Sequence, residues 1–274
     1  MKIKDIVNIP ENLKSLVPSS FDLIGSDKKF IAIIQIPEEL NEYKVEIANA
    51  IKKIHKNVVT VLNKISARQG EFRLYEFEKI IGEETEVIHK EYGYFLKLDV
   101  TKVYFNPREA NERQKIAKKV KENEKVLVMF SGIAPFAIAI AKRVNVAKIV
   151  CIEKNPYAHF YALENVRLNK LEDKIECICG DVRDVVPKLN EKFDRILMPL
   201  PFGAEDFLEY ALMVSKSGTI VHFYSLSSEN ALFKDVEEKI YRKVSREKIK
   251  IIEKEKILPY APGIFKVRVD FIVL

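Results

Sequence analysis

Short apolar runs separated by helical patterns dominate the second half of the chain. Residues 126–130 form an apolar run with the length of one buried strand, and small residues at 131–135 then make a tight turn. Residues 136–143 have the pattern of a helix, and a second apolar run at 148–152 ends at Glu153. Strand, glycine turn, helix, strand and acid together form half of a nucleotide-binding α/β unit.

Two more strands follow, and each ends in an informative residue. Residues 174–179 precede Asp181, and residues 193–198 precede the proline-rich loop 199–201. An acid after the second strand can accept hydrogen bonds from ribose hydroxyls, and one after the third can accept from an adenine amine. This order resembles a class I S-adenosylmethionine (SAM) methyltransferase. An NAD-dependent dehydrogenase would explain the glycine turn and the first acid only. We therefore expect an α/β fold with a Rossmann-like sheet.

The rest of the chain predicts a smaller module and the far end of the sheet. Residues 1–20 form an N-terminal segment, residues 21–100 a small α+β module, and residues 101–274 the methyltransferase domain. The module has predicted strands at 21–24, 29–36, 58–62, 86–89 and 94–98 and a helix at 40–55. The domain adds helices at 110–121, 204–215 and 229–246 and strands at 219–224, 249–258 and 265–274, the last two antiparallel.

Composition sets limits on partners. The chain has 274 residues, of which 47% are hydrophobic, enough for one large and one small core. Its 46 basic and 40 acidic residues give a net charge of +6. This mild excess of basic residues suits an RNA partner, but the many acidic residues argue against a uniformly basic surface or a basic tail. The 31% of charged residues is also typical of thermophile surfaces.

The cysteines indicate a reducing compartment. Cys151, Cys177 and Cys179 lack zinc-ligand spacing, and we expect them in the buried core as free thiols. No apolar run approaches the roughly 20 residues that cross a bilayer, and the first residues do not form a secretory signal. We expect a cytoplasmic, monomeric protein with no membrane segment and no metal.

A series of longer motifs makes the comparison more specific. In chain order they are GEFRLYEFEKIIGEE, VIHKEYGYFLKLDVTKVYFNPREANER, VLVMFSGIAPF, IEKNPYA, ENVRLNKLEDKI, GDVRD, DRILMPLP and IVHFYS. From about Phe21 to the C-terminus, the chain resembles the archaeal and eukaryotic tRNA (guanine-N1)-methyltransferases that act on position 37, and their wyosine-pathway relatives. The resemblance implies SAM as cofactor, the tRNA anticodon stem-loop as partner, and methylation of the purine at position 37, above all N1 of guanosine.

The same resemblance implies roles for two catalytic residues, and a third candidate lies close to them in the proposed mechanism. Glu112 matches the family's general base, and Arg73 the cation that stabilises negative charge on O6 of guanine. A surface acid that compensates the helix dipole is the alternative for Glu112. For Arg73 the alternative is a phosphate contact or a surface arginine in a basic segment. Tyr104 is expected to contact the methionine end of SAM or the target base. The alternative is a tyrosine of the hydrophobic core.

The remaining candidates bind the cofactor or the RNA. Glu153 is assigned to the ribose hydroxyls and Asp181 to the adenine amine, whereas Asn155 is expected to cap the following helix. The other cofactor candidates are Tyr104, Phe130, Gly132, Ala134 and Pro199. The candidate phosphate contacts, which position RNA without reading its sequence, are Lys64, Arg68, Arg108 and Arg113.

The chain departs from the family pattern at several points, which keep alternatives open. Val128 replaces an acid, Ala134 replaces a glycine, and Pro199 stands where guanine methylators often carry asparagine. We also find no segment that matches the extra N-terminal domain of many relatives. The first alternative is a wyosine-pathway role, either methylation of the imidazo-purine or aminocarboxypropyl transfer. The second is a SAM- and RNA-binding module with weak catalysis.

Overall fold

The computed structural model describes residues 2–274. The chain divides into two compact units, Met1–Pro107 and Arg108–Leu274. The sequence placed a boundary at residue 101, whereas the stretch 101–107 belongs to the N-terminal unit. Apolar side chains from the expected N-terminal segment join the same core as the sheet of this unit: Ile3, Val7, Ile9 and Val17.

The N-terminal unit is built on a four-stranded sheet in the order β1-β2-β3-β4. β2 and β3 are parallel and are joined through helix α1, whose Ile47 and Ile51 pack into the core. The strands are β1 Asp22–Ser26, β2 Lys29–Ile34, β3 Val58–Lys64 and β4 Phe77–Ile81, and α1 is Lys44–Ile54. A second sheet pairs β5 Glu86–Glu91 with β6 Tyr94–Asp99. The 3-10 helices are η1 Ile3–Asp5, η2 Glu11–Leu16, η3 Glu38–Tyr43 and η4 Pro107–Glu109, which runs into the C-terminal unit.

The C-terminal unit contains a seven-stranded sheet in the order β12-β13-β11-β10-β7-β8-β9. β7 to β11 run parallel, and β13 is antiparallel to both of its neighbours. The strands are β7 Lys125–Met129, β8 Lys148–Glu153, β9 Ile175–Cys179, β10 Phe193–Met198, β11 Ser215–Ser228, β12 Ile249–Ala261 and β13 Ile264–Val273. The order reverses between β7 and β10, and the loops after these strands therefore form the place where ligands bind in open α/β sheets. The predicted Rossmann-like fold is confirmed.

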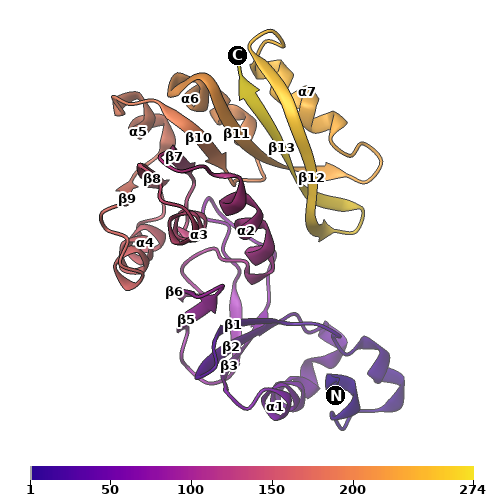
Figure 1. Ribbon diagram of the computed structural model, residues 1–274. Coiled ribbons are helices and arrows are strands. Elements are labelled where there is room, and N and C mark those ends of the chain that lie inside the picture. Colours follow the sequence, from indigo (N-terminus) through magenta and orange to yellow (C-terminus); the bar gives the residue numbers. More distant parts are fainter. Residues whose placement is uncertain (1) are drawn as a thin grey trace. The chain divides into compact units, whose positions relative to one another are not determined.

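The two faces of this sheet are covered differently. Helices α5, α6 and α7 lie over one face through a large apolar cluster that includes Ile196, Phe223 and Val269. Helices α2, α3 and α4 lie together on the other side (Figure 1). The helices are α2 Ala110–Lys119, α3 Pro135–Arg143, α4 Pro156–Leu168, α5 Val182–Val185, α6 Leu208–Met213 and α7 Lys234–Lys243, with 3-10 helices η5 Val186–Lys188 and η6 Ala204–Phe207.

Some elements differ from their prediction. β4 was not predicted, because its five residues alternate too briefly to stand out from the polar segment before them. The predicted helix 229–246 is shorter, since β11 extends to Ser228 and α7 begins at Lys234. The expectation of three buried cysteines was wrong in part. Cys151 is buried, but Cys177 is only partly buried and Cys179 is exposed, because the edge strand β9 has a neighbour on one side only.

Candidate functional site

The loop after β7 has an unusual backbone. Phe130, Gly132 and Ala134 all have positive φ angles, of 57°, 56° and 65°. A phenylalanine in this left-handed region costs of order 1–3 kcal/mol, and such strain is concentrated at functional sites. Two hydrogen bonds hold the turn: the Ser131 amide donates to the Ile152 carbonyl at 3.0 Å, and the Ala134 amide donates to the Ser131 carbonyl at 3.0 Å.

Glu153, at the end of β8, is fixed by this loop. One carboxylate oxygen accepts from the Gly132 amide at 2.6 Å, and the other accepts from the Asn155 amide at 2.8 Å. Burial raises the pKa of Glu153, and the neighbouring backbone N–H groups only partly oppose this shift. Asn155 caps α4 as predicted, because its side chain accepts from the amides of Tyr157 and Ala158. The Glu153 carboxylate is thus held at the carboxyl edge of the sheet, next to the glycine turn.

Asp181, after β9, already has a full set of partners. One oxygen accepts from the backbone amide and from Nε of Arg183, both at 2.9 Å. The other accepts from the Arg183 guanidinium at 2.7 Å and lies 3.0 Å from Nζ of Lys154. The Arg183 guanidinium holds the pKa of Asp181 well below its usual range. A carboxylate has about four acceptor positions, so an adenine amine must displace one of these donors to bind here.

Aromatic side chains flank the switch point. The ring of Phe130, from the loop after β7, meets the ring of Phe207 edge-on, with 4.8 Å between centroids. The Arg183 guanidinium lies 5.8 Å from the Phe207 ring centre. Phe207 follows the proline loop that begins at Pro199. The expected cofactor residues therefore occur at the ends of β7, β8, β9 and β10 or on the loops that follow them: Phe130, Gly132, Ala134, Glu153, Asp181 and Pro199.

These loops fit an adenosine cofactor. The turn after β7 brings small residues and backbone to the sheet edge, and Glu153 offers a carboxylate beside it. The hydroxyl of Ser131 is buried without a hydrogen-bond partner among residues 2–274, so the turn contains an unused polar group. A ribose and its hydroxyl pair match this arrangement.

Glu112 lies in the first turn of α2, but it is not a surface acid. It is 3% exposed. Its Oε1 accepts from the Tyr224 hydroxyl at 2.5 Å and from the Arg268 guanidinium, whereas its Oε2 has no hydrogen-bond partner in the described part of the chain. Burial raises the pKa of the Glu112 carboxyl, and the opposing effects of Arg268 and Tyr224 do not cancel this shift. The surface alternative for Glu112 is therefore wrong.

A buried polar network continues from Arg268 across the sheet. Arg268 is fully buried and its Nε donates to Asp270 at 2.8 Å. Asp270 lies 2.8 Å from Nδ1 of His222, and Nε2 of His222 lies 2.8 Å from the Arg195 guanidinium. Because arginine can only donate, Nε2 accepts and the neutral His222 carries its proton on Nδ1, toward Asp270. Burial lowers the pKa of His222, which favours this neutral form.

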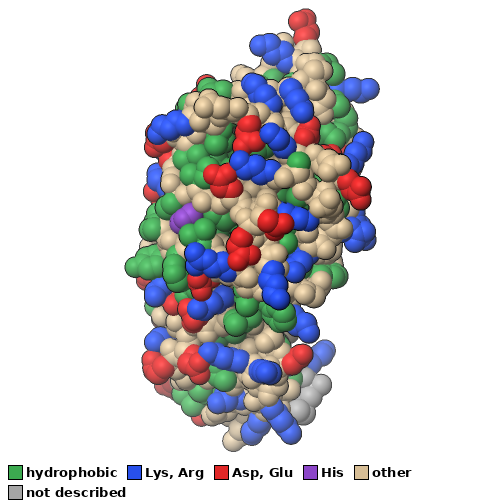
Figure 2. All heavy atoms as spheres, turned by 60° about the vertical axis from the view of Figure 1, so that its left-hand side comes forward, with side chains coloured by type: hydrophobic (Ala, Val, Ile, Leu, Met, Phe, Trp, Pro, Cys, Tyr) green, Lys and Arg blue, Asp and Glu red, His purple; other side chains and the backbone are tan. Residues whose placement is uncertain are grey.

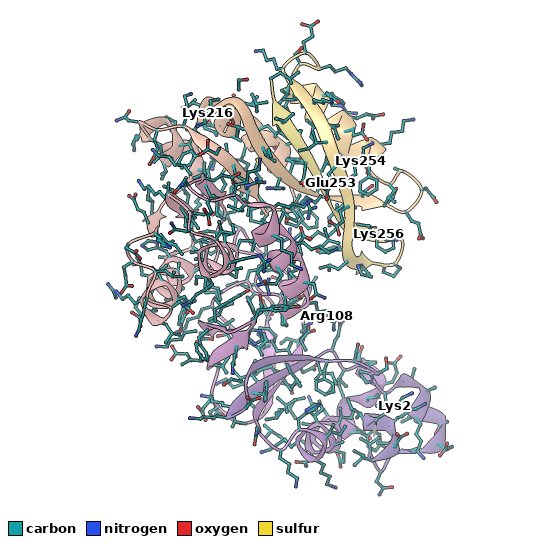
Figure 3. All side chains as sticks on the ribbon, viewed as in Figure 1. Lys2, Arg108, Lys216, Glu253, Lys254 and Lys256 are labelled. Atoms are coloured by element: carbon teal, nitrogen blue, oxygen red, sulfur yellow. The ribbon has the colours of Figure 1, made fainter. Side chains whose placement is uncertain are left out.

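The edge strand β12 completes the network from the other side. Arg268 donates to Glu253 at 2.9 Å and to Glu255 at 2.8 Å. Glu253 lies on β12 next to Lys254, as Figure 3 shows. Lys119 and Lys115 of α2 also pair with Glu253 and Glu255, respectively. The helix that carries Glu112 is therefore tied to the edge strand β12 by two ion pairs.

In the N-terminal unit, the basic segment after β3 is combined with aromatic rings. The Arg68 guanidinium lies 4.1 Å from the ring centre of Tyr104 and 4.8 Å from that of Tyr75. Nζ of Lys64 lies 4.9 Å from the Tyr75 ring. Arg73 follows in a tight turn, where its φ is 55° and its amide donates to the Gly70 carbonyl at 3.2 Å. Three sequence candidates, Lys64, Arg68 and Tyr104, therefore meet in one cluster.

The other two phosphate candidates differ from one another. Arg108 is exposed, as expected for a residue that contacts RNA (Figure 3). Arg113 is only 2% exposed, so its guanidinium is not at the surface where the prediction requires it. It lies on the buried side of α2 with Ile116 and Ala117. Figure 2 shows basic and acidic side chains interspersed on the face in view, which is not uniformly basic.

The sequence reasoning missed the partners of Glu112. Tyr224 was predicted only as a strand residue, and Arg268 only as part of the last strand. One signal was available: charged residues alternate with apolar ones along β13, and both sets are buried. The charged positions are Lys266, Arg268 and Asp270, and the apolar ones are Val267, Val269 and Phe271. Buried charges at strand spacing indicate a paired polar network rather than a solvated face.

The described residues contain neither a metal-ligand cluster nor a membrane-spanning helix. Across residues 2–274, no cluster of three or more His, Cys, Asp or Glu side chains is arranged to hold a metal ion. In the same part of the chain, no helix has both the length and the apolar character needed to cross a membrane.

Comparison with known proteins identifies the family. The model of the TRM5/TYW2 methyltransferase domain matches residues 87–252, and that of the TYW2 N-terminal domain matches residues 3–85. The chain belongs to the TRM5/TYW2 methyltransferase family. The resemblance inferred from the sequence motifs is thus confirmed, with the SAM-dependent methyltransferase fold that it implied.

Relatives within this family differ in activity. The chain is 41% identical to the tRNA (guanine(37)-N(1))-methyltransferase Trm5b of Pyrococcus abyssi over 98% of this chain and 79% of the relative. The crystal structure of that Trm5b has a TM-score of 0.87 at 40% identity and covers 100% of this chain and 80% of the other. The tRNA(Phe) (4-demethylwyosine(37)-C(7)) aminocarboxypropyltransferase of Pyrococcus horikoshii is 33% identical over 98% of this chain and 95% of the relative.

A solved complex of a TRM5/TYW2 relative includes tRNA. The structure of aTrm5 with tRNALeu has a TM-score of 0.84 at 34% identity and covers 96% of this chain and 75% of that chain.

Proposed function

We propose that this protein transfers a methyl group from SAM to N1 of guanosine at position 37 of tRNA, with Glu112 as the general base. The observation that supports this most directly is the state of Glu112. Its carboxylate is buried, its pKa is raised, one oxygen is held by two donors and the other has no partner among residues 2–274. The similarity to Trm5b supplies the substrate.

The chemistry requires a base at this position. N1 of guanine carries a proton at neutral pH, so its lone pair attacks poorly until the proton leaves. Oε2 of Glu112 accepts that proton, which typically contributes about 10²–10⁴-fold to the rate. The N1 electron pair then forms the new bond to carbon. SAM, when bound, supplies the methyl group, whose bond to sulfur breaks with the electron pair remaining on sulfur. Since Oε2 is shielded from solvent, the purine must displace the side chains that cover it.

The cofactor residues follow from the loops at the switch point. Glu153 accepts from the ribose hydroxyls, and Gly132 and Ala134 allow close approach to the backbone. Asp181 accepts from the adenine amine after Arg183 releases one of its acceptor positions. Phe130 and Pro199 line the site at the ends of β7 and β10.

The RNA residues are assigned mainly to the N-terminal unit. Arg73 stabilises the charge that develops on O6. Lys64, Arg68 and Arg108 contact phosphates, and Tyr104, held against Arg68, provides a stacking surface. The buried Arg113 is left out of this set. We assign the anticodon stem-loop as the ligand of this unit.

Two observations favour a second candidate function on the same tRNA position. The N-terminal unit matches the TYW2 N-terminal domain over residues 3–85, and Pro199 replaces the asparagine of many guanine methylators. The second candidate is therefore a wyosine-pathway activity, either methylation of the imidazo-purine or aminocarboxypropyl transfer.

Labelled SAM and defined tRNA substrates separate these functions. The protein is incubated, at stated salt, with transcripts that carry guanosine or adenosine at position 37, and the nucleosides are identified by mass. We expect 1-methylguanosine from the guanosine transcript alone. A tRNA that carries 4-demethylwyosine is tested in parallel. A product from this tRNA, with none from either transcript, would overturn the leading function in favour of the second.

A further inference from the structure

Glu112 is held asymmetrically. Oε1 accepts two hydrogen bonds, from the Tyr224 hydroxyl and from the Arg268 guanidinium. Oε2 is buried and accepts none among residues 2–274. A buried carboxylate oxygen without a partner is costly, since its desolvation is not compensated. This cost is expected where an atom is reserved for a ligand.

The two donors are themselves fixed. Tyr224 on β11 and Arg268 on β13 are direct cross-strand partners, so the sheet sets the spacing between them. Both side chains are fully buried. Arg268 is also bound by Asp270, Glu253 and Glu255, which leaves its guanidinium little freedom to turn. The donors therefore provide a rigid support for one oxygen of Glu112.

We propose that Tyr224 and Arg268 are positioning residues for the methyl transfer, which hold Oε1 of Glu112 so that Oε2 receives the proton of the target base. This inference rests on the proposed role of Glu112. In the reaction, the N1–H bond of guanine breaks and an O–H bond forms on Oε2. The hydrogen bonds from Tyr224 and Arg268 to Oε1 remain in place.

The competing explanation is that Tyr224 and Arg268 bind Glu112 only to anchor α2 to the sheet. The other ion pairs of α2 argue against this explanation. Lys266 on β13 already pairs with Glu109 at 2.9 Å, and both groups are buried. Lys115 and Lys119 tie the other side of α2 to Glu255 and Glu253. The helix is thus attached at three further points. If Glu112 served only as an anchor, the most stable arrangement would give hydrogen bonds to both of its carboxylate oxygens. Instead, Oε2 has no partner among residues 2–274.

The charged and titratable groups around Glu112 determine how its pKa responds to mutation. They come from three strands and from α2 itself: Tyr224 on β11, Arg268 and Asp270 on β13, Glu253 and Glu255 on β12, and Lys115 on α2. The Tyr224 hydroxyl and the Arg268 guanidinium both lower the pKa of Glu112, whereas Glu255 raises it. Removal of the Tyr224 hydroxyl therefore raises the pKa of Glu112 further.

Tyr224→Phe tests the inference, with Tyr94→Phe as the matched control. Tyr94 is also buried and donates its hydroxyl to a glutamate, Glu91, so both variants lose the same kind of hydrogen bond. Single-turnover rates on the tRNA that wild type modifies, SAM dissociation constants and melting temperatures are measured for both. Each is then repeated in the Glu112→Gln background.

The expected results distinguish positioning from anchoring. Tyr224→Phe should slow the single-turnover rate by about 10- to 100-fold, the effect of a lost hydrogen bond to a charged group, and leave the SAM dissociation constant unchanged. Its rate profile should rise at higher pH than that of wild type. In the Glu112→Gln background it should have no further effect on rate. Tyr94→Phe should leave the rate and its pH profile at wild-type values.

The contrary results are equally clear. If Tyr224→Phe lowers the melting temperature as Tyr94→Phe does but leaves the rate and pH profile unchanged, Tyr224 is an anchor only. A further loss of rate in the Glu112→Gln background would show that Tyr224 does not act through Glu112. The proposed function itself is tested separately, by the identity of the product that the wild-type protein forms. Its failure can therefore be distinguished from failure of this inference.

Discussion

Two acids in the C-terminal unit, the partly buried Glu153 and the buried Glu112, both have a raised pKa, but they are held in different ways. Glu153 accepts from backbone amides of its own loop and of the turn after β7. Glu112 accepts from side chains that lie 112 and 156 residues away in the chain. Among substitutions only proline removes a backbone N–H donor, whereas many substitutions remove a side-chain donor. The first arrangement suits a fixed ligand contact, and the second suits a group whose basicity is tuned.

The largest expected effect comes from the arginine that supports Glu112. Arg268→Met leaves Glu112, Asp270, Glu253 and Glu255 without their shared cation, so it should lower the free energy of unfolding by about 3–5 kcal/mol. Urea unfolding followed by circular dichroism measures this change. Arg242→Met is the control, because that exposed pair with Glu238 contributes at most about 1 kcal/mol. Equal stability of the two variants would show that the network contributes no more than a surface pair.

Substitution of Glu153 should affect the cofactor rather than the chemistry. Glu153→Gln places an amide group against the amides of Gly132 and Asn155 and removes a charged acceptor, so the SAM dissociation constant should rise by about 10- to 100-fold. Calorimetric titration with SAM gives this constant. The single-turnover rate at saturating SAM should stay near that of wild type. A large loss of rate at saturation would mean that the two acids do not have separate roles.

The two raised pKa values should appear in different measurements. Burial disfavours the carboxylate form of Glu112, so the rate should rise with pH through a pKa above the ordinary glutamate value. The same argument for Glu153 predicts that SAM affinity weakens as the pH falls through its raised pKa. The rate profile and the SAM dissociation constant are measured over the same pH range. If Glu112→Gln retains the acid limb of the rate profile, Glu112 is not the group whose ionisation controls the rate.

The smallest effect is expected at Asp181. Arg183→Ala removes the two side-chain hydrogen bonds from residue 183 to Asp181, whereas the backbone amide still donates, and it frees acceptor positions for an adenine amine. SAM affinity should increase by less than about tenfold, the equivalent of 1.4 kcal/mol. Competitive binding of labelled SAM resolves such a change. A weaker affinity would instead assign a direct cofactor contact to Arg183.

The difference between the two acids also explains what the sequence could predict. The strands β7 to β10, the turn after β7 and the positions of Glu153 and Asp181 follow from local pattern, because each acid comes within two residues of the end of an apolar run. The capping role of Asn155 is local as well. The support of Glu112 is not local: Tyr224 and Arg268 approach it only after β11 and β13 pair and α2 covers them. Sequence spacing contains no information about such a contact.

The same reasoning accounts for the residues that were placed incorrectly. The positive charge of Arg113 predicted a surface position, but helix periodicity places it on the buried side of α2 with Ile116. Cys179 was expected in the core because it ends an apolar strand, yet β9 is at the sheet edge. Strand order depends on pairing between distant segments, so a local pattern does not give it.

The most direct test of the account is the single-turnover rate of Glu112→Gln, measured with its SAM dissociation constant in the same preparation. The substrate is a tRNA transcript with guanosine at position 37, and the product is identified by mass. We predict a rate about 10²–10⁴-fold below wild type, with an unchanged SAM dissociation constant. A wild-type rate of 1-methylguanosine formation by Glu112→Gln would contradict the role of this acid and of the network that holds it.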